Sequence, residues 1–165
     1  MYKEKTQKEI YKKCDEEGSF IPLAEISIEK IKSMLKIALI DLKSSKEWIK
    51  KAPKESEQWN AIFKINYDSL HTLLEAFVTF DKLKIKTHEC LFSYVCEKYS
   101  ELEFDWNFFE KIRTKRNRSL YYGEIINYKD WEQVRLQLNL YINTIKKEIE
   151  EKLKEYEKKF NEEEE

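Results

Sequence analysis

Apolar residues recur every three or four positions along most of this chain, the spacing that buries one face of a helix. The most continuous pattern covers residues 57–81 and follows Ser56, whose hydroxyl can cap a helix. Its apolar positions are Trp59, Ile62, Phe63, Tyr67, Leu70, Leu74, Phe77 and Val78. We expect this segment to be the central helix of the fold.

Four other segments have the same spacing, at residues 28–51, 88–99, 105–123 and from 130 to about 160. Their expected caps are Ser27, Thr87, Asp105 and Asp130, and Gln133 makes the last resemble a capping box. The last helix, about 30 residues or ~45 Å long, should outrun the others and either pack on a second subunit or fray. The pattern predicts an all-α, up-and-down bundle of about five helices with a long C-terminal helix.

The ends of the chain differ from this bundle in pattern. Residues 1–18 are rich in lysine and glutamate with few apolar positions, and we expect a loosely attached arm that ends at Gly18. Residues 20–23 should form an extended strap against the bundle. We therefore divide the chain into an arm and strap (1–26), a single helical domain (27–160) and an acidic tail (161–165).

Composition excludes several classes of protein. Two glycines among 165 residues leave no P-loop or dinucleotide-binding loop, and a net charge of −1 excludes a uniformly basic nucleic-acid binder. No apolar run approaches the ~18 residues of a membrane span, so we expect a cytoplasmic protein without a membrane partner. The three cysteines, Cys14, Cys90 and Cys96, are expected to be reduced, buried thiols, and we expect no metal site and no cofactor.

Arginine is concentrated at one place. The chain has 27 lysines but four arginines, and three of these, Arg113, Arg116 and Arg118, lie within residues 113–118. A guanidinium can bind carboxylate or phosphate with two parallel hydrogen bonds, or stack on a ring, which an ammonium cannot do. This segment is therefore the main candidate for a functional surface.

Helical spacing arranges these arginines into a stripe. Arg113, Asn117 and Tyr121 fall at i, i+4 and i+8, with Arg116 about 60° to one side. The stripe can bind an anion. Alternatively, the arginines can pair with carboxylates of neighbouring helices or face water, as charge clusters usually do.

The order of these segments resembles the HEPN family, named for higher eukaryotes and prokaryotes nucleotide-binding. The resemblance covers roughly residues 27–145, and its most specific part is the pair Arg116-Asn117 late in the fourth helix. It also includes a second helix that opens with Trp59-Asn60-Ala61-Ile62-Phe63 and continues through Tyr67 and His71, and a third that starts at Thr87-His88. It implies a homodimer whose fourth helices line a cleft.

HEPN ribonucleases carry an Arg, usually followed by a polar residue, and a His after four to six intervening residues. Carried onto this chain, these are Arg116, Asn117 and, in place of the His, Tyr121, because no histidine follows His88. Tyrosine, with a pKa near 10, is a poor general base at neutral pH, although it can donate to a phosphate or stack on a base.

The resemblance implies catalytic roles for Arg116, Asn117 and Tyr121, and phosphate or RNA binding by Arg113, Arg116, Arg118 and Tyr122. His71 is a possible accessory group, more often a core or interface histidine. We expect His88 only to occupy the first turn of its helix.

Three functions remain open. The first is a homodimer that binds RNA or a nucleotide with weak or no catalysis. The second is a metal-independent endoribonuclease or toxin in which Tyr121 replaces the histidine. The third is a protein-binding partner of a minimal nucleotidyltransferase.

Overall fold

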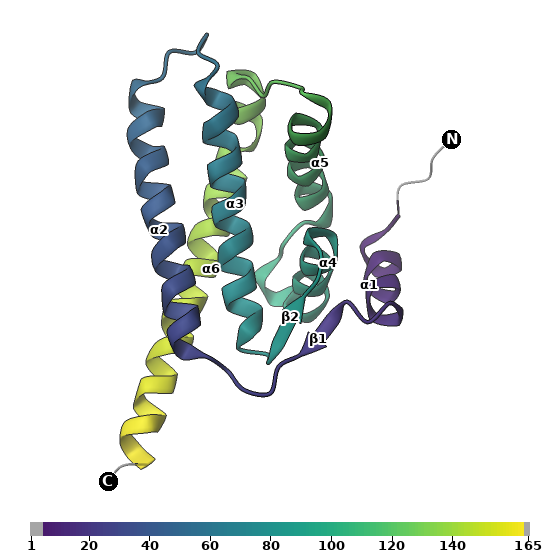
Figure 1. The fold of residues 1–165 in the computed structure, drawn as a ribbon, viewed down its shortest axis with the longest axis vertical. Helices are drawn as coiled ribbons and strands as arrows, with labels where there is room; N and C mark the ends of the chain where they lie inside the picture. The colour runs from purple at the N-terminus through teal and green to yellow at the C-terminus, as the bar shows by residue number, and fades with distance from the viewer. Residues whose placement is uncertain (1–4, 164–165) are drawn as a thin grey trace.

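The computed structural model describes residues 5–163, with side chains to residue 162, as a helical bundle with one small sheet (Figure 1). The elements in chain order are α1 (Gln7–Glu16), β1 (Phe20–Pro22), α2 (Ile28–Lys51), α3 (Gln58–Thr79), β2 (Leu83–Ile85), α4 (His88–Lys98), the 3-10 turn η1 (Ser100–Leu102), α5 (Trp106–Tyr122) and α6 (Tyr128–Glu163). The all-α prediction, with a long C-terminal helix, is confirmed. The last two residues of the expected acidic tail lie outside the described part.

Helix α3 is the centre of the bundle, as its apolar pattern predicts. It packs against α2 along its length and against α6, α4 and α5 on its other sides (Figure 1). Its buried positions include Phe63, Tyr67, Leu70 and Phe77, each fully shielded from solvent. Burying side chains of this size stabilises the fold by roughly 1.5–3 kcal/mol each. The central helix thus fixes the positions of its neighbours.

Helix caps follow the predictions except at α3 and α6. The N-cap residue of α3 is Glu57, which makes no side-chain cap, and the predicted cap, Ser56, accepts the N–H of Gln58 at 3.1 Å from one position earlier. Ser27, Thr87 and Asp105 each accept a backbone N–H in the first turn of the following helix. Helix α6 instead begins at Tyr128, because Asn127 and Asp130 each accept the other's backbone N–H at 3.1 Å. The predicted capping box of Asp130 and Gln133 was therefore wrong by one turn.

The expected strap is a short strand. Strand β1 pairs antiparallel with β2, with Phe20 opposite Ile85 and Pro22 opposite Leu83. The segment between α3 and α4, which the sequence marks only as a spacer, supplies the second strand. The backbone hydrogen bonds of the pair tie the N-terminal region to the base of the bundle.

The expected loose arm, of which residues 1–4 lie outside the described part, contains a helix fixed to the bundle. Helix α1 lies beside α4 (Figure 1), and Ile10 and Cys14, one turn apart, are 2% and 1% exposed. Cys14 and Cys90 form a disulfide with their Cα atoms 5.7 Å apart. The prediction that all three cysteines are reduced thiols was wrong, because folding brings together two cysteines 76 residues apart. Only Cys96 is free in the described part of the chain, and it is half-buried.

Helix α6 extends past the bundle at the C-terminal end (Figure 1). Its distal turns still contact this chain, through the rings of Phe80 and Tyr156 and an ion pair between Lys32 and Glu157 at 3.2 Å. Farther on, Phe160 is 64% exposed. No helix in the described residues is long and apolar enough to cross a membrane.

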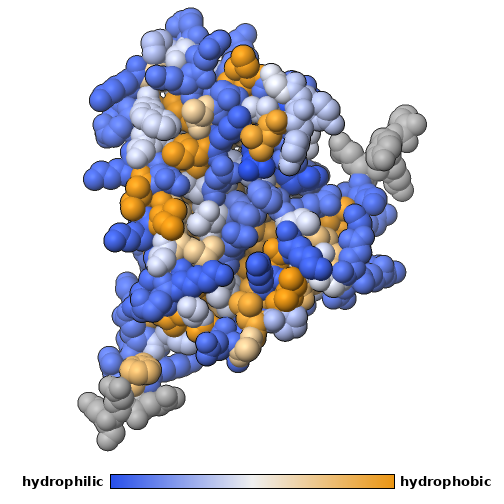
Figure 2. Space-filling model, viewed as in Figure 1, coloured by the Kyte–Doolittle hydropathy of each residue, from blue (hydrophilic) through white to orange (hydrophobic). Residues whose placement is uncertain are grey.

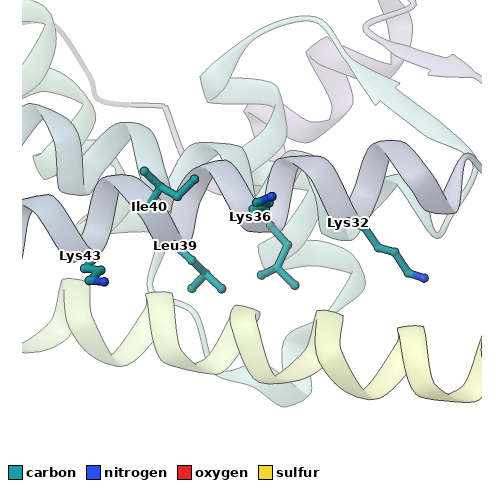
Figure 3. A pocket seen from close by; sticks show the side chains of 6 residues that line it. Lys32, Lys36, Leu39, Ile40 and Lys43 are labelled. Carbon is teal, nitrogen blue, oxygen red and sulfur yellow. The ribbon is translucent and has the colours of Figure 1, made fainter.

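The surface is largely hydrophilic in one view, with scattered apolar patches (Figure 2). A shallow hollow of about 400 Å³ on α2, beside α6, is lined by leucine, isoleucine and lysine (Figure 3). Its lining residues are Lys32, Leu35, Lys36, Leu39, Ile40 and Lys43. Apart from the lysines this lining is aliphatic, with no histidine, cysteine or carboxylate.

Candidate functional site

Helix α5 carries the arginines and is fixed at both ends. The Asp105 side chain caps the N–H of Asn107 at 2.9 Å, and Tyr141 Oη accepts the N–H of Asp105 at 2.7 Å. At the other end, Gly123 adopts φ 68°, the left-handed conformation that glycine tolerates best. The stacked rings of Phe92 and Phe109, 4.4 Å apart, set α5 against α4. The arginine positions therefore follow from well-packed neighbours.

Arg113 is held by carboxylates. Its Nε and Nη2 each donate to Glu110 at 2.7 Å, and Nη2 also lies 3.5 Å from Glu89 of α4. The hydrogen bonds to Glu110 raise the pKa of Arg113, and the residue is a charged link between α5 and the first turn of α4. This is the pairing with neighbouring carboxylates that the sequence left open. Its donors reach a phosphate only by competing with these acids.

Arg116 is less completely paired. Its side chain is 20% exposed, and its Nη2 donates to Asp68 Oδ1 at 3.3 Å, a long bond to a half-exposed acid. The guanidinium carbon lies 5.5 Å from the centre of the Tyr67 ring, a cation–π distance. The Nε atom is buried with no hydrogen-bond partner in the described chain. A buried guanidinium donor without an acceptor is costly, so Nε is an unsatisfied polar group of this site.

The two histidines of the chain meet beside Arg116. The His71 and His88 rings stack with centroids 3.6 Å apart, although one lies on α3 and the other opens α4. Tyr67, one turn before His71 on α3, places its hydroxyl 2.7 Å from His88 Nδ1. Phe92 packs edge-on against the rings of both Tyr67 and His71. We call Tyr67, His71, His88 and Arg116 the histidine–arginine cluster.

Burial and charge keep both histidines neutral near pH 7. Burial, followed by the charges of His88 and Arg116, lowers the pKa of His71 to about 3. Burial, followed by the charges of Arg116 and Arg113, lowers the pKa of His88 to about 4. Neutral imidazoles can accept a proton, and they can stack without repulsion between two like charges.

The hydrogen bond from Tyr67 sets the tautomer of His88. Burial raises the pKa of Tyr67, so its hydroxyl keeps its proton. His88 Nδ1 is the hydroxyl's only partner in the described chain, and a buried donor without an acceptor is costly. We therefore assign the hydroxyl as donor and Nδ1 as acceptor, which leaves the proton of His88 on Nε2. His88 then offers a donor, and His71 is the group available as a base.

The other residues of the predicted stripe lie away from this cluster. Tyr121 and Tyr122 are 73% and 79% exposed at the end of α5. Arg118 is also exposed, 4.0 Å from Glu124, and Asn117 is half-buried beside Arg116. The structure thus brings Arg116 to the accessory His71, with Asn117 next to it in the chain. The roles predicted for Tyr121, Tyr122 and Arg118 stay predictions.

His88 is the cluster member that the sequence missed. It does occupy the first position of its helix, as expected, but it also joins the cluster. One signal was present, because Tyr67 and His71 are spaced i, i+4 and face the same direction. Nothing in the spacing indicates that the start of a later helix completes the group.

Two further observations concern metal binding and the relation of this chain to known proteins. Within residues 5–162, no three His, Cys, Asp or Glu side chains converge in a way that could hold a metal ion. Comparisons with protein-family models, curated proteins and solved structures gave no match. The resemblance to the HEPN family therefore stays a prediction that rests on the residues named for it.

Proposed function

We propose that this protein binds RNA or a nucleotide at the histidine–arginine cluster, with Arg116 as the phosphate-binding residue. The observation that carries the proposal is the half-buried Arg116 guanidinium, which among the described residues has one ion pair, 3.3 Å long, and an Nε without an acceptor. A phosphate oxygen would give this group charge-assisted hydrogen bonds that the described chain does not provide. His88 Nε2–H is a second donor for the same anion.

The test is RNA binding measured by fluorescence anisotropy at low salt. Arg116→Ala should weaken binding by about tenfold or more, because it removes a charge-assisted contact worth roughly 1.5–3 kcal/mol. Arg135→Ala is the matched control, since Arg135 is exposed on α6, outside the cluster. Arg116→Lys should not restore full affinity, because an ammonium lacks the planar donors. Equal effects of Arg116→Ala and Arg135→Ala would contradict the proposal.

A second function, metal-independent cleavage of RNA, is favoured by the stacked histidines. In such a reaction His71 would accept the proton of the ribose 2′-hydroxyl as its oxygen bonds to phosphorus. The bond from phosphorus to the 5′-oxygen breaks, and that oxygen takes a proton from water or from His71, which the first step has protonated. Arg116 would stabilise the charge on the phosphate oxygens. The histidine pair, and not Tyr121, would then carry out the proton transfer.

Single-turnover cleavage with EDTA present separates the two catalytic assignments. Loss of cleavage in His71→Asn with full activity in Tyr121→Phe would favour the histidine pair. The reverse result would favour the tyrosine. Binding that depends on Arg116 without cleavage would leave the protein as an RNA-binding module. The absence of both binding and cleavage would favour the third function, in which the partner is a protein such as a minimal nucleotidyltransferase.

The homodimer is also part of the proposal. Four apolar residues at the end of α5 and just after it are solvent-exposed, at 46% for Leu120, 73% for Tyr121, 79% for Tyr122 and 63% for Ile125. Adjacent exposed apolar side chains of this size are typical of an interaction surface. Pairing through this surface would bring two copies of α5 together, as the resemblance implies.

A further inference from the structure

A groove of about 1130 Å³ runs between α1 and α5, separate from the histidine–arginine cluster. The α1 side contributes Lys5 and Lys13, and the α5 side contributes Trp106, Lys111, Lys115 and Arg118. Arg113 also lines it, and Arg113 pairs with Glu89, the residue after His88. Glu89 itself lines the groove, which therefore reaches the first turn of α4, one residue from His88 of the cluster.

The α1 wall is firmly attached. The Cys14–Cys90 disulfide joins it to α4, and Gln7 Nε2 donates to Ser93 O and to Glu97 Oε2, both at 3.0 Å. Ile10, which lies at the base of the wall, is 2% exposed. The groove consequently has two fixed sides, which reduces the entropic cost of binding an extended ligand.

The charges of the groove favour an anion. It is lined by six cationic side chains and two carboxylates, Glu89 and Glu110, and these acids are already paired with Arg113. Lys115 is bound to Asp130 at 2.6 Å. Among the described residues, Lys13 and Arg118 have only long pairs with exposed acids, at 3.9 and 4.0 Å, and such pairs contribute little.

Two lysines complete the cationic lining. Lys5 and Lys111 have no carboxylate within 4.0 Å in residues 5–162. Four cations, on both walls, are thus available to a ligand. Trp106, half-buried at one end, adds a ring on which a base can stack. Cations that follow a groove, combined with an aromatic ring in its lining, are the features that bind single-stranded nucleic acid without sequence preference.

We infer that this groove binds the backbone of single-stranded RNA that continues from the phosphate held at Arg116. The inference rests on the proposed function and names its ligand class, a strand rather than a free nucleotide. The α5 wall from Trp106 to Arg118 is ~18 Å long at 1.5 Å per residue. At ~3.4 Å per stacked nucleotide, that length fits about five nucleotides.

The test is anisotropy with a fluorescein-labelled 12-nucleotide oligouridylate and the oxidised full chain. Lys13→Glu and Lys111→Glu, one on each wall, should each weaken binding by about tenfold at low salt. Lys12→Glu is the matched control, because Lys12 neighbours Lys13 on α1 but does not line the groove and is 79% exposed. It should change the affinity by less than about twofold.

Two results would contradict the inference that the groove binds single-stranded RNA. One is an equal effect of Lys12→Glu and Lys13→Glu, which would mean that only net charge matters. The other is full competition by a poly-glutamate peptide of equal length, which would indicate an acidic protein partner. Arg116→Ala keeps the two proposals apart. If it leaves binding unchanged, the proposed function fails, while the comparison of Lys13 and Lys12 still reports on the groove.

Discussion

The imidazoles of His71 and His88 stack with their centroids 3.6 Å apart, next to the guanidinium of Arg116. A charged pair at this distance would repel, and Arg116 adds a third positive charge. The arrangement is therefore stable only while both rings are neutral. Neutrality, set by burial, links the chemistry of the site to the stability of the fold.

The first prediction concerns pH. The unfolded histidines bind protons near pH 6.5, whereas in the folded protein the pKa values are about 3 and 4. Between these limits the unfolded state binds more protons, so the free energy of unfolding falls as the pH falls below about 6.5. Urea unfolding of the wild type at pH 7.5 and 5.0 should show this loss.

The control for this effect is the double variant His71→Asn, His88→Asn. Without the two histidines, the loss of stability between pH 7.5 and 5.0 should be smaller. Asp68 and Glu75 titrate in both proteins, and burial raises their pKa values, so the difference between the proteins isolates the histidines. Parallel pH profiles for the two proteins would contradict neutral histidines in the folded state.

The second prediction concerns the hydroxyl of Tyr67. Tyr67→Phe leaves the buried Nδ1 of His88 without its donor, and it should destabilise the fold by about 1–2 kcal/mol. The hydrogen bond from Tyr67 stabilises the neutral form of His88, so its loss should also raise the pKa of His88. Nitrogen-15 NMR of the imidazoles measures both the tautomer and the titration. A wild-type His88 protonated on Nδ1 would show that the hydroxyl is the acceptor instead.

The third prediction concerns the disulfide. Cys14 and Cys90 are 76 residues apart, and the chain-entropy relation gives about 4 kcal/mol for a loop of that length. Reduction should therefore lower the denaturation midpoint of the wild type. Cys96→Ser should respond to reductant as the wild type does, because Cys96 is free. Cys14→Ser should be insensitive, and a response equal to that of the wild type would place the bond elsewhere.

The disulfide is also relevant to the cellular compartment of the protein. Such bonds persist mainly in oxidising compartments, whereas the cytoplasm, where we expect this protein, keeps most cysteines reduced. That expectation stays a prediction.

The fourth prediction concerns the dimer. Tyr121→Glu with Tyr122→Glu should shift the protein toward a monomer in sedimentation analysis, because it buries two charges in the proposed apolar interface. The matched control is Ile37→Glu with Ile40→Glu on α2, where the side chains are 54% and 55% exposed. A dimer that only the α2 variant breaks would move the interface to α2.

Local sequence signals were sufficient for the elements of the bundle. The apolar spacing of α3, the Asp105 cap and Gly123 each act within a few residues, so they identify helices without knowledge of their packing. The same holds for the arginines, because Arg113, Arg116 and Arg118 are adjacent in the chain. These features determine that the protein is helical and that α5 carries its unusual cations.

Tertiary structure decided which groups meet. The spacing of α5 places Arg116 beside Tyr121, yet packing turns Arg116 toward Tyr67 and Asp68 of α3. The His71–His88 pair and the Cys14–Cys90 bond join residues from different helices, and their distances depend on the closure of the whole bundle. Helical periodicity reports on one helix at a time, so it cannot encode contacts that arise only when separate helices pack.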